Sequence, residues 1–516
     1  MGARSGARTR MSFTLLMLAP VLIPALGAVT CAVFGWRRAT AWIGVACAAA
    51  VLAAGVVLAA ETTLTGPRTS LGGQLRVDAL SAFMLIVIGA ISVLATAASP
   101  AWLRTEITAG RANHRSARWH SLLVQAFVAA MALAVLAANL GTVWVAVEAT
   151  TIITAFLVGQ RRTRAAVEAG WKYVVICSVG IALAFLGAVL LNYASAHAGA
   201  AGAGLAGNRL DWAALAAGAH SLDPGVTRIA VALLIIGFGT KAGLAPLHAW
   251  LPDAHGQAPA PVSALMSGVL LSVAFYAILR VKVIADAALG VAFTRTLLAV
   301  IALATLAIAA SLLLAQRDYK RMLAYSSIEH MGLLALGAAA GSRLALAAVL
   351  LHVLGHGLGK AVLFLSSGRI LQVTGTSQIG KVRGLATRQP LLAGCFGLGV
   401  LALIGLPPFS LFASGFGIAR AGFAEGLGWV TAASFVFVLV IAAAVLTHTG
   451  RMLLGPPPPS DAPATDPADR GAVNLALPAS GAVPLLVGLT ACAALGITLG
   501  PLQQLLHSAA TLVGTP

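Results

Sequence analysis

The sequence predicts an all-α, polytopic membrane protein, and three observations indicate this fold class. Of the 516 residues, 59% are hydrophobic and only 9% are charged, whereas soluble domains carry about 25% charged residues. Apolar runs of about 20 residues, the length that crosses a bilayer as a helix, recur along the chain. The basic residues behind the net charge of +18 gather in short clusters between these runs. Such clusters are typical of loops that orient membrane helices, not of a nucleic-acid-binding surface.

The apolar runs predict about fourteen membrane spans. Their expected limits are 12–34, 40–60, 77–98, 121–138, 141–159, 173–195, 227–253, 262–279, 291–315, 322–341, 344–370, 391–418, 428–447 and 480–500. We group them into helices 1–3 (12–120), a first repeat of helices 4–8 (121–280), a second repeat of helices 9–13 (291–450) and a segment with helix 14 (480–516). Residues 1–11 form an N-terminal extension, and 451–479 a Pro- and Asp-rich linker with little expected regular structure.

Two of the expected spans carry prolines in their middle. Helix 7 reads GFGTKAGLAPLHAWLPDAH, with Pro246 and Pro252, and helix 12 reads LIGLPPFSLFASGF, with Pro407 and Pro408. Proline removes a helical hydrogen-bond donor and clashes with the preceding turn. At membrane depth, such backbone is tolerated only where protein buries it or where it lines a wet cavity. Two broken spans, five helices apart, predict a transporter-like architecture of two inverted repeats.

The orientation is expected from the basic clusters within 104–118, 161–172, 317–321 and 381–388, which fall on one side of the membrane. The side richer in basic residues is the cytoplasmic one. Both termini are then outside, in a prokaryotic-type inner membrane. The extension MGARSGARTR conflicts with this orientation because its arginines must cross, and a start at Met11 removes the conflict. The first apolar run is long enough to span, which argues against a cleavable signal peptide.

Ionisable side chains inside membrane spans are costly and are functional by default. They occur here in helices 5, 7, 10 and 11, and the residues are Glu148, Lys241, Glu329, His330, His352, His356 and Lys360. The three in helix 11 are four residues apart, which predicts one polar stripe facing helix 10 or helix 12 in the bundle interior. Glu148 and Lys241 are expected to face each other, because each is costly alone in a dry interior.

These residue types suit proton transfer. A proton crosses about 30 Å of hydrocarbon only if groups along the way bind and release it. Desolvation favours the neutral form of lysine, whereas a nearby carboxylate holds lysine charged. Histidine titrates near neutrality through either ring nitrogen. Structural alternatives stay open: a fixed ion pair between Glu148 and Lys241, and histidine hydrogen bonds between helices.

No metal, cofactor or catalytic centre is expected in this chain. Iron–sulfur and zinc sites need closely grouped ligands, and the cysteines are far apart without a C-x-x-C pair: Cys31, Cys47, Cys177, Cys395 and Cys492. His352 and His356 lack the intervening glutamate of an H-E-x-x-H zinc motif. The sequence also offers no nucleophile–base set and no phosphate-binding loop.

Two stretches carry a family resemblance. KAGLAPLHAWLPDAHGQAPAPVSALMSGVLL (241–271) resembles the signature of the proton-translocating, antiporter-like membrane subunits of respiratory complex I, Mrp-type antiporters and energy-converting hydrogenases. YSSIEHMG (325–332), with LHVLGHGLGKAVLFLSSG (351–368), is most similar to hydrogenase-4 component F of the formate hydrogenlyase group. The resemblance implies that Glu148 and Lys241 gate proton uptake and that Lys360 is the lysine of the H-A-x-x-K-A-x-L-F motif.

The sequence departs from the family pattern at two places. Relatives often carry a lysine or histidine in helix 8, where this chain has Ser267 and Ser272. They also carry a lysine or glutamate just after the helix 12 break, where this chain has Gly415. The group that completes the exit half of a proton path therefore stays open, and the candidates are Arg420, Glu425 and His448.

The resemblance implies a proton-translocating membrane subunit of a complex I-like (NADH:quinone oxidoreductase-like) or group 4 hydrogenase-like oxidoreductase. Its redox centres would lie in partner subunits. The expected partners are other membrane and peripheral subunits and the lipid bilayer, and no nucleic acid. The alternatives are a subunit of a Mrp-type cation/proton antiporter, a membrane subunit of an inorganic-carbon uptake complex, and a non-conducting structural spacer. The electron donor and acceptor, proton or sodium coupling and subunit stoichiometry stay open.

Overall fold

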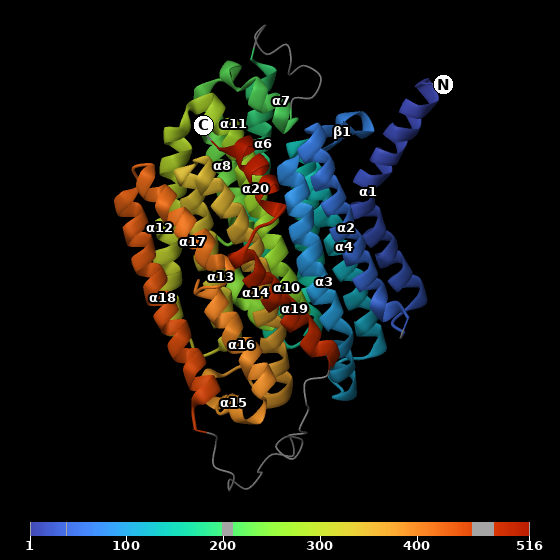
Figure 1. Cartoon of the computed structure of the whole chain (residues 1–516), viewed down its shortest axis with the longest axis vertical. Coiled ribbons are helices and arrows are strands. Elements are labelled where there is room, and N and C mark those ends of the chain that lie inside the picture. The colour runs from blue at the N-terminus through green and yellow to red at the C-terminus, as the bar shows by residue number, and fades with distance from the viewer. Residues whose placement is uncertain (1, 38, 199–209, 457–478, 515–516) are drawn as a thin grey trace.

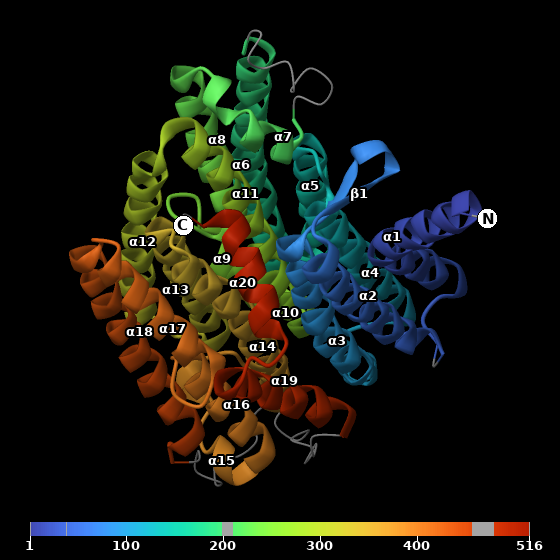
Figure 2. The same ribbon diagram turned by 45° about the horizontal axis from the view of Figure 1, so that its top comes forward.

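The protein is a bundle of helices that run mostly along its long axis (Figures 1 and 2). The computed structural model describes residues 2–37, 39–198, 210–456 and 479–514. In this part of the chain, 12 helices are long and apolar enough to cross a membrane, and Pro390–Leu403 is a shorter apolar helix. The predicted fold class, an all-α polytopic membrane protein, is confirmed. The described strands form one short antiparallel hairpin, β1 (Arg68–Ser70) and β2 (Leu75–Val77).

Each expected span contains at least one helix, although several limits differ and expected helices 7 and 12 are interrupted. The first half contains α1 Gly2–Phe34, α2 Ile43–Thr65, α3 Ala79–Thr108, α4 His114–Leu136, α5 Leu140–Val158, α6 Arg164–Ala196, α7 Trp212–Ala217, α8 Pro224–Ala242, α9 Trp250–Gln257, α10 Ala260–Leu265 and α11 Leu271–Leu289. The second half contains α12 Val291–Leu314, α13 Tyr319–Ala340, α14 Arg343–Thr374, α15 Leu385–Arg388, α16 Pro390–Leu403, α17 Ser410–Ala424, α18 Gly428–Leu454, α19 Ala479–Ile497 and α20 Leu502–Val513. The two-repeat relation stays a prediction.

Local sequence signals set many of these helix ends. Side-chain oxygens accept hydrogen bonds from the first free backbone amides of several helices, which is the usual way to satisfy a helix N-terminus. The capping residues include Asp78 for α3, Asn113 for α4, Thr163 for α6, Asp223 for α8, Asp318 for α13 and Ser342 for α14. These caps fix the residue at which each of these helices begins.

The two proline breaks lie close to their predicted positions. In expected helix 7, α8 ends at Ala242, and Gly243 adopts a left-handed conformation with φ +76° before Pro246. Pro252 does not belong to the break, because it lies in the first turn of α9, where the missing amide hydrogen has no helical partner to lose. In expected helix 12, α16 and α17 are separated by a segment with Pro407 and Pro408.

Expected helix 8 is longer than predicted and irregular. A π-helical turn, Met266–Leu270, joins α10 to α11. This turn carries Ser267, whose hydroxyl hydrogen-bonds to that of Ser327 on α13 at 2.9 Å. Single π-helical turns inside helices are rare and often lie at functional sites. This turn is not predictable from the sequence, because its apolar residues suit an α-helix and a π-helix equally.

Close packing of α6 against α8 depends on glycine. A Cβ atom on Gly237 of α8 would lie 2.6 Å from the backbone oxygen of Gly180, and one on Gly180 would lie 2.4 Å from the Cβ of Thr240. In membranes, helices associate through such small residues because no hydrophobic driving force between the helices is available. The contact therefore fixes α8, which ends in Lys241, against α6.

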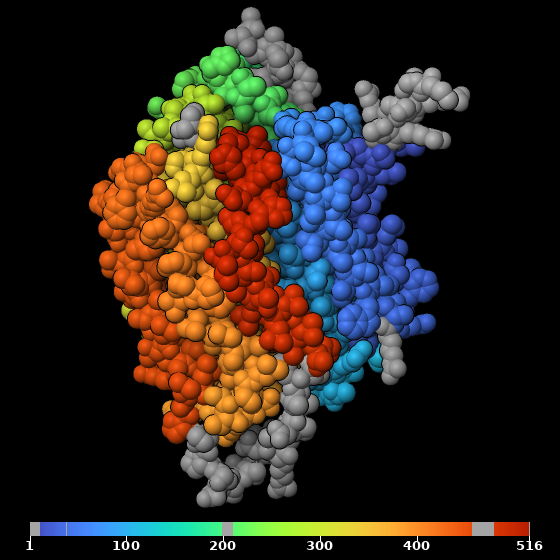
Figure 3. All heavy atoms as spheres, in the orientation of Figure 1, coloured from blue at the N-terminus to red at the C-terminus, as the bar shows by residue number. Residues whose placement is uncertain are grey.

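The C-terminal helices cross one face of the molecule between the N-terminal helices and the second half (Figure 3). α20 was not expected; it is a helix of 12 residues that buries one side against α3 and α14. The expected linker 451–479 begins later than predicted, since α18 continues to Leu454, and its residues 457–478 lie outside the described part. The two ends of the described chain lie toward the same end of the bundle (Figure 1), and which side is outside stays a prediction.

Three basic residues near the ends of expected spans are buried: Arg280, Lys282 and Lys320. The Arg280 guanidinium pairs with the Asp78 carboxylate at 2.7 Å and stacks over the Trp212 ring at 3.8 Å. Lys282 pairs with Asp286 one turn further along α11. A charged residue therefore need not lie in a loop, because a partner of opposite charge allows it to be buried.

We expect Gly237→Ala to destabilise the protein by about 1–3 kcal/mol, because the added methyl group overpacks the α6–α8 contact. Thermal unfolding of the purified protein in detergent measures the effect. Gly394→Ala in α16 is the control, since a Cβ there meets no atom within 4 Å and gains the same helix propensity. Equal unfolding midpoints for the two variants would contradict the packing assignment.

Candidate functional site

The first buried group is Lys241, in the last turn of α8. Its side chain is fully buried, and its Nζ atom donates a hydrogen bond to the Tyr173 hydroxyl of α6 at 2.8 Å. The same ring is in contact with Trp250 of α9, with centroids 5.0 Å apart. The Lys241 ammonium is therefore held by a neutral hydroxyl at the edge of the helix 7 break.

Glu148 does not form an ion pair with Lys241 within 4.0 Å in the described part of the chain. The Glu148 side chain is half-buried on α5 and accepts a hydrogen bond from the Thr151 hydroxyl at 2.8 Å. α6 packs against both α5 and α8 and brings Tyr173 to Lys241. The expected facing pair of Glu148 and Lys241 is thus not a direct ion pair in this structure.

His255 is a buried group that the sequence analysis missed. It lies on α9 between the rings of Trp250 and Phe364, at centroid distances of 6.4 and 5.1 Å. Among the described atoms, neither of its ring nitrogens has a hydrogen-bond partner. Its only sequence signal was its place in the motif KAGLAPLHAWLPDAHGQAPAP, which also holds Lys241.

Lys320 is a second missed group, since its position near a helix start resembles that of an ordinary loop lysine. It is buried, and its Nζ atom donates to the backbone oxygens of Gly256 and Ala258, each at 2.9 Å. These carbonyls lie at the C-terminal end of α9, where a helix leaves acceptors free. Lys320 thereby joins α13 to the C-terminal end of α9.

The polar stripe on α14 lies in the interior, as predicted, and faces α13 and α17. Lys360 donates to the Leu323 carbonyl at 2.6 Å and also to the Ser326 hydroxyl. His352 lies 3.0 Å from His330 between ring nitrogens. All stripe residues, together with Glu329 and His330, are at most 5% exposed. Three histidines and a lysine thus form one buried cluster, to which His356 belongs through its ring contact with His330.

The cluster continues to the helix 12 break through Ser414, and not through a charged residue. The Ser414 hydroxyl of α17 lies 2.9 Å from Nδ1 of His352. Of the three candidates for the exit group, Arg420 is exposed and Glu425 pairs with Arg295 at 3.4 Å near the surface. His448 lies half-buried on α18. Ser414 directly precedes Gly415, so the polar contact of the cluster at this end is a hydroxyl.

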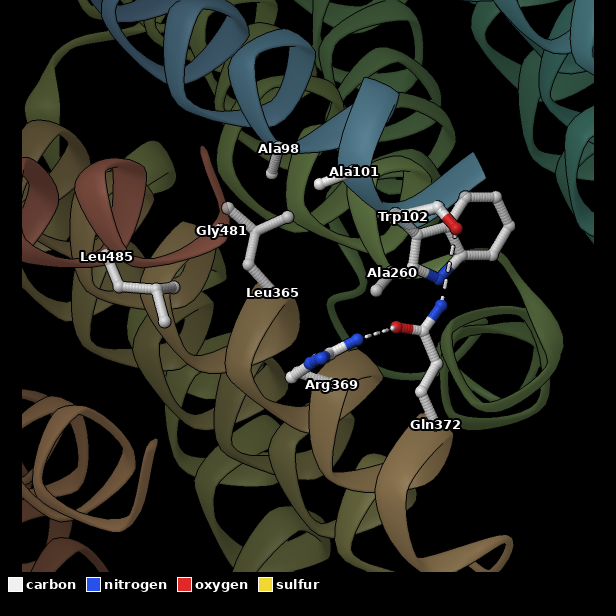
Figure 4. A pocket seen from close by; sticks show the side chains of 9 residues that line it. All are labelled: Ala98, Ala101, Trp102, Ala260, Leu365, Arg369, Gln372, Gly481 and Leu485. Carbon is white, nitrogen blue, oxygen red and sulfur yellow. Dashed lines mark hydrogen bonds between the residues drawn. The ribbon is translucent and has the colours of Figure 1, made fainter. Parts of the chain in front are cut away.

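A small pocket lies between α3, α10, α14 and α19 (Figure 4). Its volume is about 40 Å³, enough for at least one water molecule. At its edge, Gln372 donates to the Glu106 carboxylate at 2.9 Å, and Glu106 also pairs with Arg111 at 3.0 Å. This hydrogen bond to Glu106 raises the pKa of Arg111. The pocket is therefore small and mostly apolar, with the polar side chains of Arg369 and Gln372 in its lining.

The described residues contain no group of three or more histidine, cysteine, aspartate or glutamate side chains arranged to hold a metal ion. The five cysteines are all free and buried. The site therefore consists of protonatable side chains and hydroxyls.

Broken helices around a buried polar axis define the class of ion-translocating membrane proteins built from interrupted helices. Residues 137–442 match the family model described as NADH:quinone oxidoreductase/Mrp antiporter, TM. The chain belongs to this family, and the resemblance drawn from the sequence motifs is confirmed.

Relatives and a solved structure agree with this assignment. The hydrogenase-4 component F homolog of Methylacidiphilum infernorum is 37% identical over 383 residues, which cover 74% of this chain and 78% of that protein. NADH-quinone oxidoreductase subunit N of Desulforudis audaxviator is 32% identical over 463 residues, which cover 86% of this chain and 87% of that protein. A chain of the Mrp complex from Dietzia sp. superposes with a TM-score of 0.81 at 25% identity, covering 97% of both chains.

We expect Tyr173→Phe to destabilise the protein by about 1–3 kcal/mol, because the buried Lys241 amine loses its hydrogen-bond acceptor. The ring, and with it the packing on Trp250, is kept. Chemical denaturation in detergent measures the change, and Tyr193→Phe is the control, since Tyr193 lies on the same helix with 53% of its surface exposed. If both variants unfolded alike, the hydroxyl would not be what holds Lys241.

Proposed function

We propose that this chain is a proton-translocating membrane subunit of a multisubunit, complex I-like or hydrogenase-4-like oxidoreductase in an inner (cell) membrane. The observation that carries the proposal is the buried series of titratable side chains that runs from Lys241 to His352 inside a bundle with two broken helices. Ionisable groups at membrane depth are costly and mark ion pathways.

The uptake end of the series is Glu148 with Lys241. Glu148 is half-buried and so is reached by protons before the fully buried Lys241. Tyr173 holds the lysine through a neutral hydroxyl, which accepts a hydrogen bond from either the charged or the neutral amine. Lys241 therefore changes its protonation state without losing its partner, as a transfer group must.

The middle of the series is His255, which faces both halves. On one side its ring is stacked with Trp250, beside Lys241 and Tyr173, and on the other with Phe364, one turn from Lys360. Both of its ring nitrogens lack protein partners in the described part of the chain. Imidazole accepts a proton at one nitrogen and releases one from the other, so we assign His255 to transfer between the two lysines.

The exit half runs through the α14 cluster. Lys360, near the Glu329 carboxylate, is followed by His356, His330 and His352, and the last contact is with Ser414. Hydrogen bonds between imidazoles and a hydroxyl form a chain that passes a proton without moving a heavy atom far. The contact of Ser414 with His352 supports a relay in which the Ser414 hydroxyl passes the proton on to water.

The names of the relatives favour redox coupling, because they are a hydrogenase-4 component and an NADH-quinone oxidoreductase subunit. The redox centres would then lie in partner subunits. The second candidate is a cation/proton antiporter subunit, which the likeness to the Mrp complex supports. A non-conducting spacer would keep the fold without proton movement, and the variants below separate it from both.

We expect Lys241→Ala to abolish proton movement through this chain while assembly is kept, because alanine adds no bulk and leaves Glu148 free to become neutral. The proton-to-electron ratio of the complex in reconstituted vesicles measures the loss. Lys381→Ala, at an exposed lysine, is the control. An unchanged ratio would make Lys241 a structural partner and would favour the spacer.

We expect His255→Leu to slow proton transfer about 100-fold, the scale of a lost general acid–base group. Leucine fills the space between Trp250 and Phe364 without adding a polar atom, so folding should be preserved. Proton uptake into reconstituted vesicles is measured beside His220→Leu, a substitution at an exposed histidine. A transfer rate equal to that of the control would exclude His255 from the path.

A further inference from the structure

We propose that a groove formed by α4, α5 and α6 binds an anionic phospholipid, with its phosphate headgroup among arginines at one end of the bundle. The groove has a volume of about 1250 Å³, more than the roughly 300–1,000 Å³ of typical small-molecule pockets. α5 packs against both α4 and α6, so the three helices are neighbours. The site is separate from the buried titratable series and does not rest on the proposed function.

Four arginines line the mouth of the groove: Arg111 and Arg115 at the start of α4, and Arg161 and Arg162 after α5. Arg111 pairs with Glu106, whereas the other three have no carboxylate within 4.0 Å among the described residues. Basic pockets between membrane helices bind anionic lipid headgroups, at about 1 kcal/mol per arginine or lysine near the surface. The protein therefore compensates only part of the positive charge of this mouth, through the Arg111–Glu106 pair.

A polar pair lies on the floor beneath the arginines. His120 is 1% exposed, and its Nδ1 atom lies 3.0 Å from the side-chain oxygen of Gln160. Its other ring nitrogen has no partner among the described atoms. Both residues line the groove. A buried polar group left unsatisfied by the protein is costly, so the floor offers a further hydrogen-bonding position for a polar headgroup.

Below the arginines, the walls of the groove are apolar and exposed. Ile152 and Phe156 of α5 are 60% and 66% exposed, and the Trp119 and Trp171 rings of α4 and α6 are 50% and 66% exposed. Tryptophans gather at the headgroup level of bilayers. An apolar wall beneath a belt of tryptophan and arginine matches the order of groups along a phospholipid, from phosphate to acyl chain.

The depth of the groove distinguishes a lipid from a free anion. Leu123 lies about two helical turns beyond Arg115 on α4, or roughly 12 Å at about 1.5 Å per residue, and both residues line the groove. A free phosphate would occupy only the mouth and leave the apolar walls bare. A partner protein would need an acidic segment above an apolar one, whereas an anionic lipid carries both in one molecule and is present wherever the chain is embedded.

The test is native mass spectrometry of the full chain, or of its intact complex, titrated with phosphatidylglycerol and with zwitterionic phosphatidylcholine. The wild type should bind phosphatidylglycerol more tightly. The double variant Arg115→Gln/Arg162→Gln should bind it about 30-fold more weakly, from about fivefold for each arginine. Gly159→Leu should also weaken binding, because a Cβ at Gly159 points into open space and its side chain fills the groove.

Matched controls are Arg118→Gln/Arg164→Gln, two exposed arginines at the same end of the bundle that do not line the groove, and Gly394→Leu, which also has open space. Both should bind like the wild type. The proposal is overturned if the two lipids bind equally, if inorganic phosphate displaces phosphatidylglycerol as well as added lipid does, or if the arginine variants behave like their control. It is also overturned if a photo-crosslinker at Phe156 in the intact complex captures a partner subunit and no lipid.

Discussion

A positive charge that is buried in the interior of a membrane protein needs acceptors from the protein, and three lysines meet this need in similar ways. Lys241 uses a tyrosine hydroxyl, Lys320 two backbone carbonyls, and Lys360 a carbonyl with a serine hydroxyl. Free carbonyls occur where helices end or are interrupted. Of the three lysines, Lys320 uses such a helix end, the C-terminus of α9, whereas Lys360 shares the Leu323 carbonyl inside α13 and Lys241 binds a tyrosine hydroxyl. Each buried lysine is therefore held by a neutral acceptor that a neighbouring element presents.

The kind of partner separates titratable from fixed charge. Hydroxyls and carbonyls accept hydrogen bonds from an ammonium or from a neutral amine, so the lysines that they hold keep their place in either protonation state. Arg280 is different, since guanidinium stays charged in proteins and is paired directly with the Asp78 carboxylate. That pair joins the start of α3 to α11 as a permanent contact. The same bundle thus contains lysines that can release their proton and an arginine that stays charged.

The sequence predicted the features that depend on local pattern. These local features are the span lengths, the prolines at 246, 407 and 408, and the four-residue spacing of the α14 stripe. The structure contains long apolar helices, interruptions at these prolines and a buried stripe on α14. The position of Tyr173 between helices 5 and 7 and the burial of His255 and Lys320 were not predicted, because they depend on which helices become neighbours. α20 was not predicted because a helix of 12 residues is shorter than a membrane span. The π-helical turn was not predicted because amino-acid composition does not distinguish it from an α-helix.

The contact of α19 with the helix 12 break bears on how the protein is made. A Cβ atom on Gly496 would lie 1.9 Å from the carbonyl oxygen of Pro408, and Cys492 touches Ser410. α19 therefore covers the backbone between α16 and α17 directly. Chains emerge from the ribosome N-terminus first. The backbone between α16 and α17 is therefore not covered by α19 until residues 479–497 have been inserted into the bilayer. Biogenesis of the second half thus completes only with its late-synthesised helix, and shortened chains would present an open break to membrane proteases.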